Sequence, residues 1–266
     1  MNKTLVSNFL RSIGLLYPLD KARFQLEKRN NKRANLEFRK KHPNVKLPPD
    51  YLMYESFQMN YDKYYTESIE AANWLISHFK RHVNLENAAI LDWGCGPGRI
   101  IRHLPDILGN NCSYFGTDYN AESIAWCSKN IQNVAFNHNQ LNASLPYPDN
   151  SFDVIYGISI FTHLSENLHY DWTEELFRVL KPSGILFLTT QGDPFKPKLT
   201  ENELETYNQN KLVIRGKVKE GHRTYSAFHP PEFMNKLFKN GSVLEHIVRP
   251  TLKGRSLPQD IWIVTK

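Results

Sequence analysis

Cysteine is scarce in this chain, and long apolar runs are absent. Its 266 residues include only three cysteines, at positions 95, 112 and 127, with no C-x-x-C spacing. We therefore expect neither a disulfide framework nor a zinc site. No stretch reaches the roughly 18 apolar residues of a membrane-spanning helix. Arg11 interrupts the apolar N-terminus and no small-residue cleavage site follows, so a secretory signal is not expected and the chain is predicted to be cytoplasmic.

Composition excludes the other non-globular classes. Apolar residues make up 41% and charged residues 23% of the chain, with 13 Gly and 15 Pro, so neither disorder nor a collagen-like repeat is expected. The net charge of +6 is unevenly distributed: residues 1–50 carry 12 Lys+Arg and 4 Asp+Glu, whereas the remainder is slightly acidic. The positive charge therefore belongs to an N-terminal extension.

Two interpretations of this basic extension remain open. Its charge can simply keep a helical segment soluble. Alternatively, it contacts an anionic partner, either a phosphorylated substrate or a membrane surface that the protein touches peripherally, because Leu5, Phe9, Ile13 and Leu16 could share one helix face.

The hydrophobic pattern predicts a helical extension over residues 1–60 and a main domain over 61–266. Apolar spacing indicates a helix that begins at Thr66 and leads into the domain. Strand and helix patterns then alternate, which is typical of a parallel sheet covered on both faces. We expect strands at 89–93, 113–117, 134–137, 152–159 and 185–190, helices at 99–108, 121–130 and 166–180, and a turn at 181–184.

The C-terminal part departs from this alternation. A helix is predicted over 231–239, followed by two strands at 242–248 and 261–264 that form a hairpin and place an antiparallel strand at the end of the sheet. The sheet thus has seven mostly parallel strands in an α/β, Rossmann-like arrangement. Residues 193–229 fit no element of the repeat, so we interpret them as an insertion over one end of the sheet.

The most informative motif follows the first predicted strand. Asp92 precedes three glycines, Gly94, Gly96 and Gly98, in a D-x-G-x-G-x-G pattern. Glycines between a strand and a helix allow the backbone and the first N–H groups of the helix to approach a ligand. An acid two residues before the first glycine suits an ammonium group better than a pyrophosphate, which distinguishes this loop from the dinucleotide fingerprint.

A second acid lies at the end of the next strand. Asp118 can accept hydrogen bonds from a ribose diol, and Tyr119 can lie against an adenine. A nucleoside with an amino-acid tail, S-adenosylmethionine, fits this pair of acids better than NAD or ATP does. The alternative is that Asp92 and Asp118 are ordinary cap and turn residues.

With these motifs the sequence resembles the class I S-adenosylmethionine-dependent methyltransferases. The run from Leu145 to Tyr156, LPYPDNSFDVIY, is similar to the family's stretch before strand 4, and Arg178 to Gly184, RVLKPSG, is similar to its R-V-L-K-P-G-G turn. The similarity covers residues 66–192 well and 230–266 loosely.

The resemblance implies roles for individual residues. Asp118 would hold the ribose, Tyr119 would pack on the adenine, and Ile158 at the end of strand 4 would face the cofactor. Asn139 and Gln140 would bound the adenine amino edge, although many relatives have an acid followed by Ala there. The residues that would line the methionine end are Asp92, Gly94, Cys95, Gly96 and Gly98.

Methyl transfer from a sulfonium is an in-line displacement, so the protein mainly aligns the acceptor and excludes water. His163, just after the fourth strand of the main domain, is the candidate general base for a hydroxyl acceptor, because an imidazole pKa near 6.5 suits proton abstraction. The alternative is a structural histidine bonded to backbone. We expect no metal site. Polar residues of the insertion could contact the acceptor: Tyr207, Arg215, His222, Arg223, Tyr225 and His229.

The sequence thus predicts a methyltransferase that acts on a small molecule, with O-methylation of a saccharide or another biosynthetic intermediate as the first hypothesis. Two alternatives remain: a nucleic-acid methyltransferase and a non-catalytic subunit that binds S-adenosylmethionine. The basic extension favours the first of these, whereas the absence of N-P-P-Y, D-P-P-Y and catalytic-cysteine motifs argues against it. The oligomeric state is left open.

Overall fold

The computed structural model describes residues 3–252, 254 and 256–266, with side chains from residue 8 onward. The chain divides into two compact units. The glycine-loop unit comprises Tyr17–Gln140, and the insertion unit comprises Leu141–Lys266 together with the N-terminal segment up to Leu16. In the described part of the chain, no helix combines the length and apolarity that crossing a bilayer requires.

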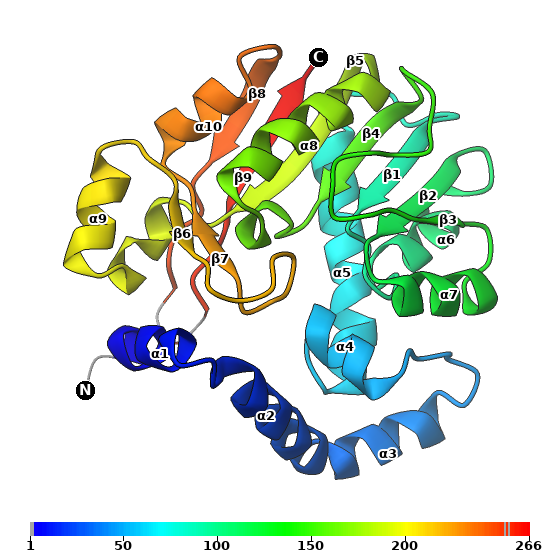
Figure 1. Cartoon of the computed structure of the whole chain (residues 1–266). Helices are drawn as coiled ribbons and strands as arrows, with labels where there is room; N and C mark the ends of the chain where they lie inside the picture. Colours follow the sequence, from blue (N-terminus) through cyan, green and yellow to red (C-terminus); the bar gives the residue numbers. More distant parts are fainter. Residues whose placement is uncertain (1–2, 253, 255) are drawn as a thin grey trace. The chain divides into compact units, whose positions relative to one another are not determined.

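The strands form a seven-stranded sheet in the order β3-β2-β1-β4-β5-β9-β8 (Figure 1). Neighbours β1–β2, β2–β3 and β4–β5 pair in parallel, whereas β9 runs antiparallel to both β5 and β8. The predicted mostly parallel, Rossmann-like sheet with an antiparallel C-terminal strand is therefore confirmed. The strand bounds are β1 Ala89–Trp93, β2 Ser113–Asp118, β3 Ala135–His138, β4 Phe152–Gly157, β5 Leu180–Thr190, β8 Ser242–Ile247 and β9 Asp260–Thr265.

One helix of the glycine-loop unit begins earlier along the chain than the apolar spacing suggested, and another has the predicted bounds of 121–130. The unit contains α2 Leu16–Asn30, α3 Lys32–Lys41, α4 Asp50–Ser56, α5 Tyr61–Phe79, α6 Leu104–Leu108 and α7 Ala121–Asn130. The prediction that α5 starts at Thr66 was wrong, because Asn60 caps it by accepting from the backbone N–H of Lys63 at 3.0 Å. Buried Tyr61 and Tyr64 then anchor its first turn in the core.

The predicted helix over residues 99–108 begins two residues later in the structure and changes type along its length. Only a 3₁₀ turn at Ile101–His103 and α6 are helical. Gly94, Gly96 and Gly98 all have positive φ, at 76°, 52° and 68°, so the chain leaves β1 in a series of turns that an α-helix cannot include.

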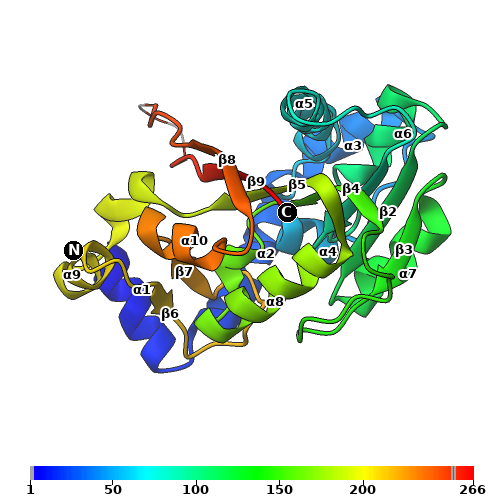
Figure 2. The same ribbon diagram turned by 90° about the horizontal axis from the view of Figure 1, so that it is seen from above.

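The insertion unit packs α8 Glu166–Val179 and α10 Pro231–Leu237 beside its strands, and both views show these two helices on the same side of them (Figures 1 and 2). The turn predicted at 181–184 is part of β5, which begins directly at Leu180. Ser183 adopts a φ of 64°, and the register with β4 shifts between Phe152 and Val154. The R-V-L-K-P-S-G run therefore joins the end of α8 to an irregular start of β5.

Residues 193–229 contain regular elements of their own. These are a 3₁₀ segment Asp193–Lys198, helix α9 Glu201–Asn208 and a two-stranded hairpin of β6 Val213–Arg215 and β7 Ser226–Phe228. Thr200 and Glu203 form a capping box that starts α9, and Phe195, Tyr207, Val213 and Phe228 share a hydrophobic cluster. The insertion is thus a small folded layer.

The N-terminal helix α1 (Lys3–Ser12) belongs to the insertion unit. Its Arg11 is half-buried, and one Arg11 nitrogen, Nη1, donates to the carbonyl oxygens of Thr224, Arg215 and Gly216 at 2.6, 2.9 and 3.4 Å. The expectation that Ile13 and Leu16 continue one helix face was wrong, because α1 ends at Ser12 and Gly14 has a φ of 73°.

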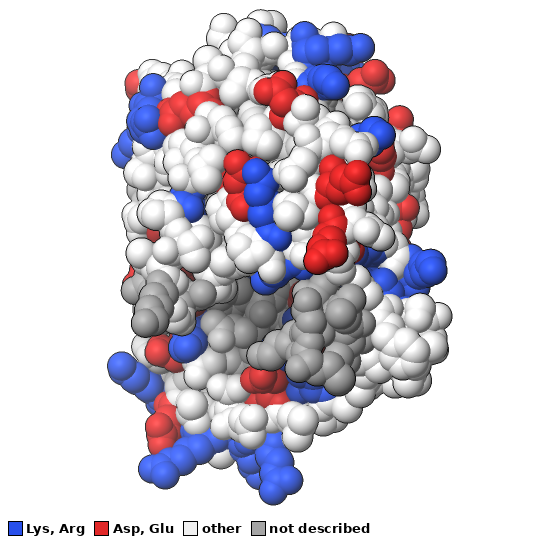
Figure 3. Space-filling view, turned by 90° about the vertical axis from the view of Figure 1, so that its left-hand side faces the viewer, with Lys and Arg blue, Asp and Glu red and all other residues white. Residues whose placement is uncertain are grey.

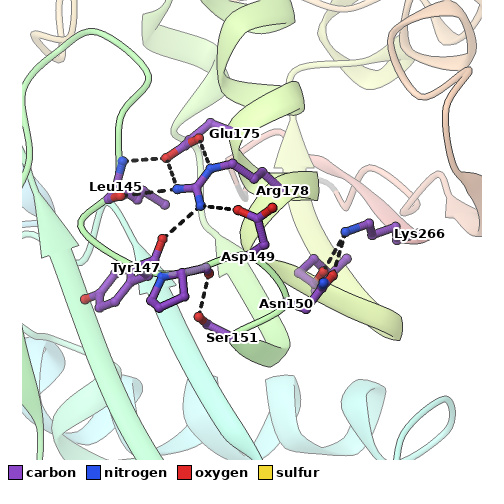
Figure 4. A network of polar contacts seen from close by, with 10 residues as sticks. Leu145, Tyr147, Asp149, Asn150, Ser151, Glu175, Arg178 and Lys266 are labelled. Carbon is purple, nitrogen blue, oxygen red and sulfur yellow. Dashed lines mark hydrogen bonds and ion pairs between the residues drawn. The ribbon is translucent and has the colours of Figure 1, made fainter.

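Arg178 holds the loop of residues 145–151, which precedes β4, through several hydrogen bonds (Figure 4). Its guanidinium forms two bonds of 2.7 Å to Glu175 and one of 2.7 Å to Asp149, and it donates to the carbonyl of Tyr147 at 2.9 Å. Glu175 also accepts from the backbone N–H of Leu145 at 2.5 Å. These bonds fix the loop against α8 and raise the pKa of Arg178.

Three buried histidines make the fold sensitive to acid. Burial lowers the pKa of His103 and His169 to about 4, and that of His229 well below its usual value. His169 Nδ1 donates to the Ser165 carbonyl at 2.7 Å, which leaves its Nε2 to accept from His229 Nε2 at 2.9 Å. Both rings of this pair are therefore neutral in the folded protein.

We expect stability to fall as the pH drops below about 6.5, because the unfolded chain then binds protons that the buried rings do not. A histidine that is protonated in the unfolded chain but neutral in the folded protein lowers the free energy of unfolding by about 1.4 kcal/mol for each pH unit between 6.5 and 4. Urea unfolding at a series of pH values would measure it. His103→Gln is expected to reduce the pH dependence, and His78→Gln at the end of α5 is the control; an equal dependence in both variants would contradict the prediction for His103.

Candidate active site

The glycine loop is fastened to the end of the neighbouring strand. The backbone N–H groups of Gly94 and Cys95 both donate to the Thr117 carbonyl, at 2.8 and 2.9 Å. Asp92 lies in β1 just before this loop and is 4% exposed. Because β1 and β2 are parallel, their carboxyl ends meet at the same edge, which is where ligands of open α/β sheets bind.

Small residues are also required here by packing. A Cβ on Gly98 would lie 2.4 Å from Cδ1 of Ile131, and one on Gly96 would lie 3.3 Å from Cβ of Ser56. Cys95, which precedes Gly96, is buried; its thiol points to the Gly96 carbonyl at 3.4 Å, and burial raises its pKa. Cys95 is therefore a protonated packing residue of the loop and not a nucleophile.

Asp118 connects the loop to β2. Its Oδ2 accepts from the backbone N–H of Gly96 at 2.8 Å, and its Oδ1 accepts from that of Asn120 at 2.7 Å. The residue is 8% exposed; burial raises its pKa, and these two backbone bonds oppose the rise. Each carboxylate oxygen keeps capacity for one more donor. The sequence predicted a ribose contact but not that the same carboxylate shapes the loop.

The residues predicted for the adenine lie beside Asp118. Half-buried Tyr119 follows it, and the Tyr119 carbonyl accepts from His138 Nε2 at 3.1 Å. Asn139 is buried and donates through its backbone to the Asp118 carbonyl at 3.2 Å. Its side-chain Nδ2 donates to the carbonyl of exposed Gln140 at 2.7 Å.

Asn139 tests whether this edge fits a nucleoside. Its Oδ1 is buried and has no hydrogen-bond partner among the described residues. A buried acceptor without a partner costs about 1–3 kcal/mol, and an exocyclic amine of an adenine is a donor that would satisfy it. The hydrogen-bond acceptors of this unit, the Asp118 carboxylate and the Asn139 amide oxygen, therefore fit the donors of the predicted cofactor.

In the insertion unit, the chain leaves β4 through Ile158 and then Ser159, which adopts a φ of 65°. Ile158 is half-buried. The Ser159 backbone N–H donates to Thr189 Oγ1 at 2.9 Å, and Gln259 Nε2 donates to Ser159 Oγ at 2.7 Å. This polar network holds the start of the 3₁₀ segment Phe161–His163.

His163 is oriented by the hairpin loop of the insertion. Its Nδ1 lies 2.8 Å from the Tyr225 carbonyl, and a carbonyl can only accept, so Nδ1 carries the proton and Nε2 bears the lone pair of the neutral ring. Burial lowers the His163 pKa more than the bond to Tyr225 raises it. The same loop holds the backbone, since Gly221 N–H donates to the His163 carbonyl at 2.9 Å.

Several insertion residues proposed as acceptor contacts have structural partners instead. The Tyr207 hydroxyl bonds Asp193 and the His229 carbonyl, both at 3.0 Å. Arg215 forms a bidentate pair with Glu203 at 2.7 and 2.8 Å. His229 faces His169, as described above, and Tyr225 is buried. Glu220 attaches the loop that carries His222 and Arg223 to the start of α8, because its carboxylate accepts from the backbone N–H of Ser165.

The fold and sequence can be compared with known proteins. Residues 90–184 match the family model described as a methyltransferase domain. The chain is 30% identical over 115 residues to malonyl-[acyl-carrier protein] O-methyltransferase of Enterobacter lignolyticus, covering 43% of each chain. It is 34% identical over 103 residues to tRNA (carboxymethyluridine(34)-5-O)-methyltransferase of Arabidopsis thaliana, covering 38% of this chain and 24% of the relative. The chain thus spans less than half the length of these curated relatives.

Solved structures agree with the fold. A SAM-dependent methyltransferase from Methanosarcina mazei superposes with a TM-score of 0.54 at 20% identity, covering 72% of this chain and 96% of that one. A SAM dependent methyltransferase from Aquifex aeolicus gives a TM-score of 0.51 at 17% identity, with 82% and 97% coverage. The family match falls on β1, the glycine loop and the strands that follow. Residues 90–184 thus match a methyltransferase domain, and the chain has the fold of the solved S-adenosylmethionine-dependent methyltransferases.

Proposed function

We propose that this protein transfers the methyl group of S-adenosylmethionine to a hydroxyl group of a small molecule, a saccharide or another biosynthetic intermediate. The observation that carries the choice of a hydroxyl is the geometry of His163. A hydroxyl needs a base, and a neutral imidazole with its proton fixed on Nδ1 presents Nε2 as that base.

In the proposed reaction, Asp118 binds the ribose, Asp92 and the glycine loop face the methionine end, and Tyr119 and Asn139 contact the adenine. S-adenosylmethionine would supply an activated methyl group, with a neutral thioether as the leaving group. As the acceptor oxygen forms its bond to the methyl carbon, His163 Nε2 takes the hydroxyl proton and later releases it to solvent. Ile158 would help to exclude water from the reacting centre.

The proposal is tested by titrating the protein with S-adenosylmethionine and then offering isotope-labelled cofactor with hydroxylated acceptors. We expect saturable binding and labelled product together with S-adenosylhomocysteine. Absence of cofactor binding in the folded protein would overturn the proposal. Binding with no transfer to any acceptor class would instead support a non-catalytic subunit.

A nucleic-acid acceptor is the second candidate, favoured by the basic N-terminus and by one relative whose name describes tRNA methylation. Assays with tRNA and duplex DNA over a range of salt concentrations separate it from the first, because phosphate contacts make affinity fall steeply with salt. Labelled nucleic acid with such a salt dependence would replace the small-molecule assignment. The proposed location is the cytoplasm, with peripheral contact to an anionic surface.

A further inference from the structure

Helix α2 of the glycine-loop unit has an inner and an outer side. Its inner side is defined by residues one turn apart: Asp20 accepts from the Tyr54 hydroxyl at 2.8 Å, Phe24 packs on Tyr54 with ring centroids 5.3 Å apart, and Lys28 pairs with Asp50 at 2.9 Å. Leu19 and Leu26, two turns apart, lie on the other side of the helix. They are 47% and 60% exposed.

Helix α3 repeats the arrangement. Asn35 and Phe38 are buried, and Asn35 bonds the Met59 carbonyl and the Tyr61 N–H at 2.8 and 2.9 Å. Leu36, in contrast, is 52% exposed. Figure 1 shows α2 and α3 following one another with α4 on the same side of both. We call the outer sides of both helices the α2–α3 basic face; it comprises Leu19, Arg23, Leu26, Arg29, Lys32, Arg33, Leu36 and Lys40.

The charge of this segment differs from that of the rest of the surface. Residues 16–41 contain nine Lys or Arg and three Asp or Glu, and every basic member of the face is exposed. On the face of the protein drawn in Figure 3, acidic and basic side chains are interspersed. A concentration of one sign attracts an oppositely charged partner.

Apolar exposure is concentrated in the same part of the chain. Of the thirteen large apolar side chains exposed in the part that the structure describes, seven lie between residues 9 and 36. A phosphorylated metabolite or a nucleic acid would use the basic groups but has no need of exposed leucines. An anionic bilayer uses both, because leucines enter the interface while Lys and Arg are attracted to lipid phosphates.

We propose that the α2–α3 basic face docks the protein on the surface of an anionic lipid bilayer. The leucines insert to the depth of the headgroups and the basic side chains pair with lipid phosphates, so the helices lie in the plane of the interface. None of these residues belongs to the proposed cofactor site or the His163 segment, so this inference does not depend on the reaction.

The test is co-sedimentation of the full chain with vesicles of phosphatidylcholine alone or mixed with phosphatidylglycerol. We expect binding only to the anionic vesicles, with an affinity that falls as salt is raised. Arg29→Gln with Lys40→Gln should weaken it roughly fivefold for each charge removed. Leu19→Gln with Leu26→Gln should weaken it about tenfold or more.

Matched controls change the same residue types elsewhere. Leu244 is 43% exposed and Lys236 and Lys239 are exposed, so Leu244→Gln with both lysines changed to Gln should bind vesicles like the wild type. Titration of every variant with S-adenosylmethionine shows, independently of vesicle binding, whether the variant is folded and binds the cofactor. Equal loss in the control, equal binding to neutral vesicles, or binding to tRNA without binding to vesicles would overturn the docking proposal.

Discussion

Replacing Asp118 by Ala is expected to weaken S-adenosylmethionine binding by about 1.5–3 kcal/mol, or roughly 10- to 150-fold, the value of hydrogen bonds to a charged group. The loss has two sources. The ribose would lose its carboxylate, and the backbone N–H groups of Gly96 and Asn120 would lose the oxygens that hold the loop at 2.8 and 2.7 Å. Calorimetric titration measures the change.

Asp118→Asn separates the two sources, because the amide keeps one acceptor oxygen without the charge. We expect an affinity between that of the wild type and that of the Ala variant. Asp106→Ala, at an exposed acid on α6, is the control and should bind normally. If Asp118→Ala remains folded by circular dichroism and binds the cofactor with unchanged affinity, the assignment of Asp118 to the ribose is wrong.

For His163, the expected effect is on turnover and not on cofactor binding. Removing a general base costs about 10²- to 10⁴-fold in rate, so His163→Ala should lower kcat by that factor with S-adenosylmethionine affinity retained. His163→Asn is the informative partner, because its Nδ2 can still donate to the Tyr225 carbonyl while the base nitrogen is gone. Both variants should be impaired; near-normal turnover in the Asn variant would make His163 a structural residue.

The pH profile gives an independent measure of the same role. A base must be neutral to accept a proton, and burial lowers the pKa of His163 from its usual 6.5. The acidic limb of kcat/KM should therefore have its midpoint below pH 6.5, and the His163→Asn variant should lack that limb. A limb that persists unchanged in the variant would assign it to another group.

Local patterns were sufficient to predict the sheet, and they also named the residues that we propose bind the cofactor. The D-x-G-x-G-x-G spacing and the acid at the end of the next strand are short-range signals, and strands that alternate with helices specify a parallel order. Helix starts were less predictable, because a cap such as Asn60 and the positive φ of three glycines override apolar spacing. Capping and backbone conformation decide where these helices start, and the spacing of apolar residues does not reflect either of them.

Contacts between distant residues could not be predicted. Nothing near His163 in the sequence indicates that Tyr225, 62 residues later, fixes its tautomer. Likewise, the loop-holding bond from Gly96 to Asp118 and the orphaned oxygen of Asn139 arise only when strands meet at one edge. The sequence named these residues as cofactor contacts, whereas their internal bonds depend on the fold.

The hydrogen bonds of Arg11 to the hairpin loop between β6 and β7 affect the order in which the chain folds during synthesis. Arg11 leaves the ribosome before its three carbonyl partners, which are 204 to 213 residues further along. At about 5–20 residues per second, α1 waits roughly 10–40 s before those partners exist. Helix α1 is therefore seated on the hairpin loop only after residues 215–224 have been made.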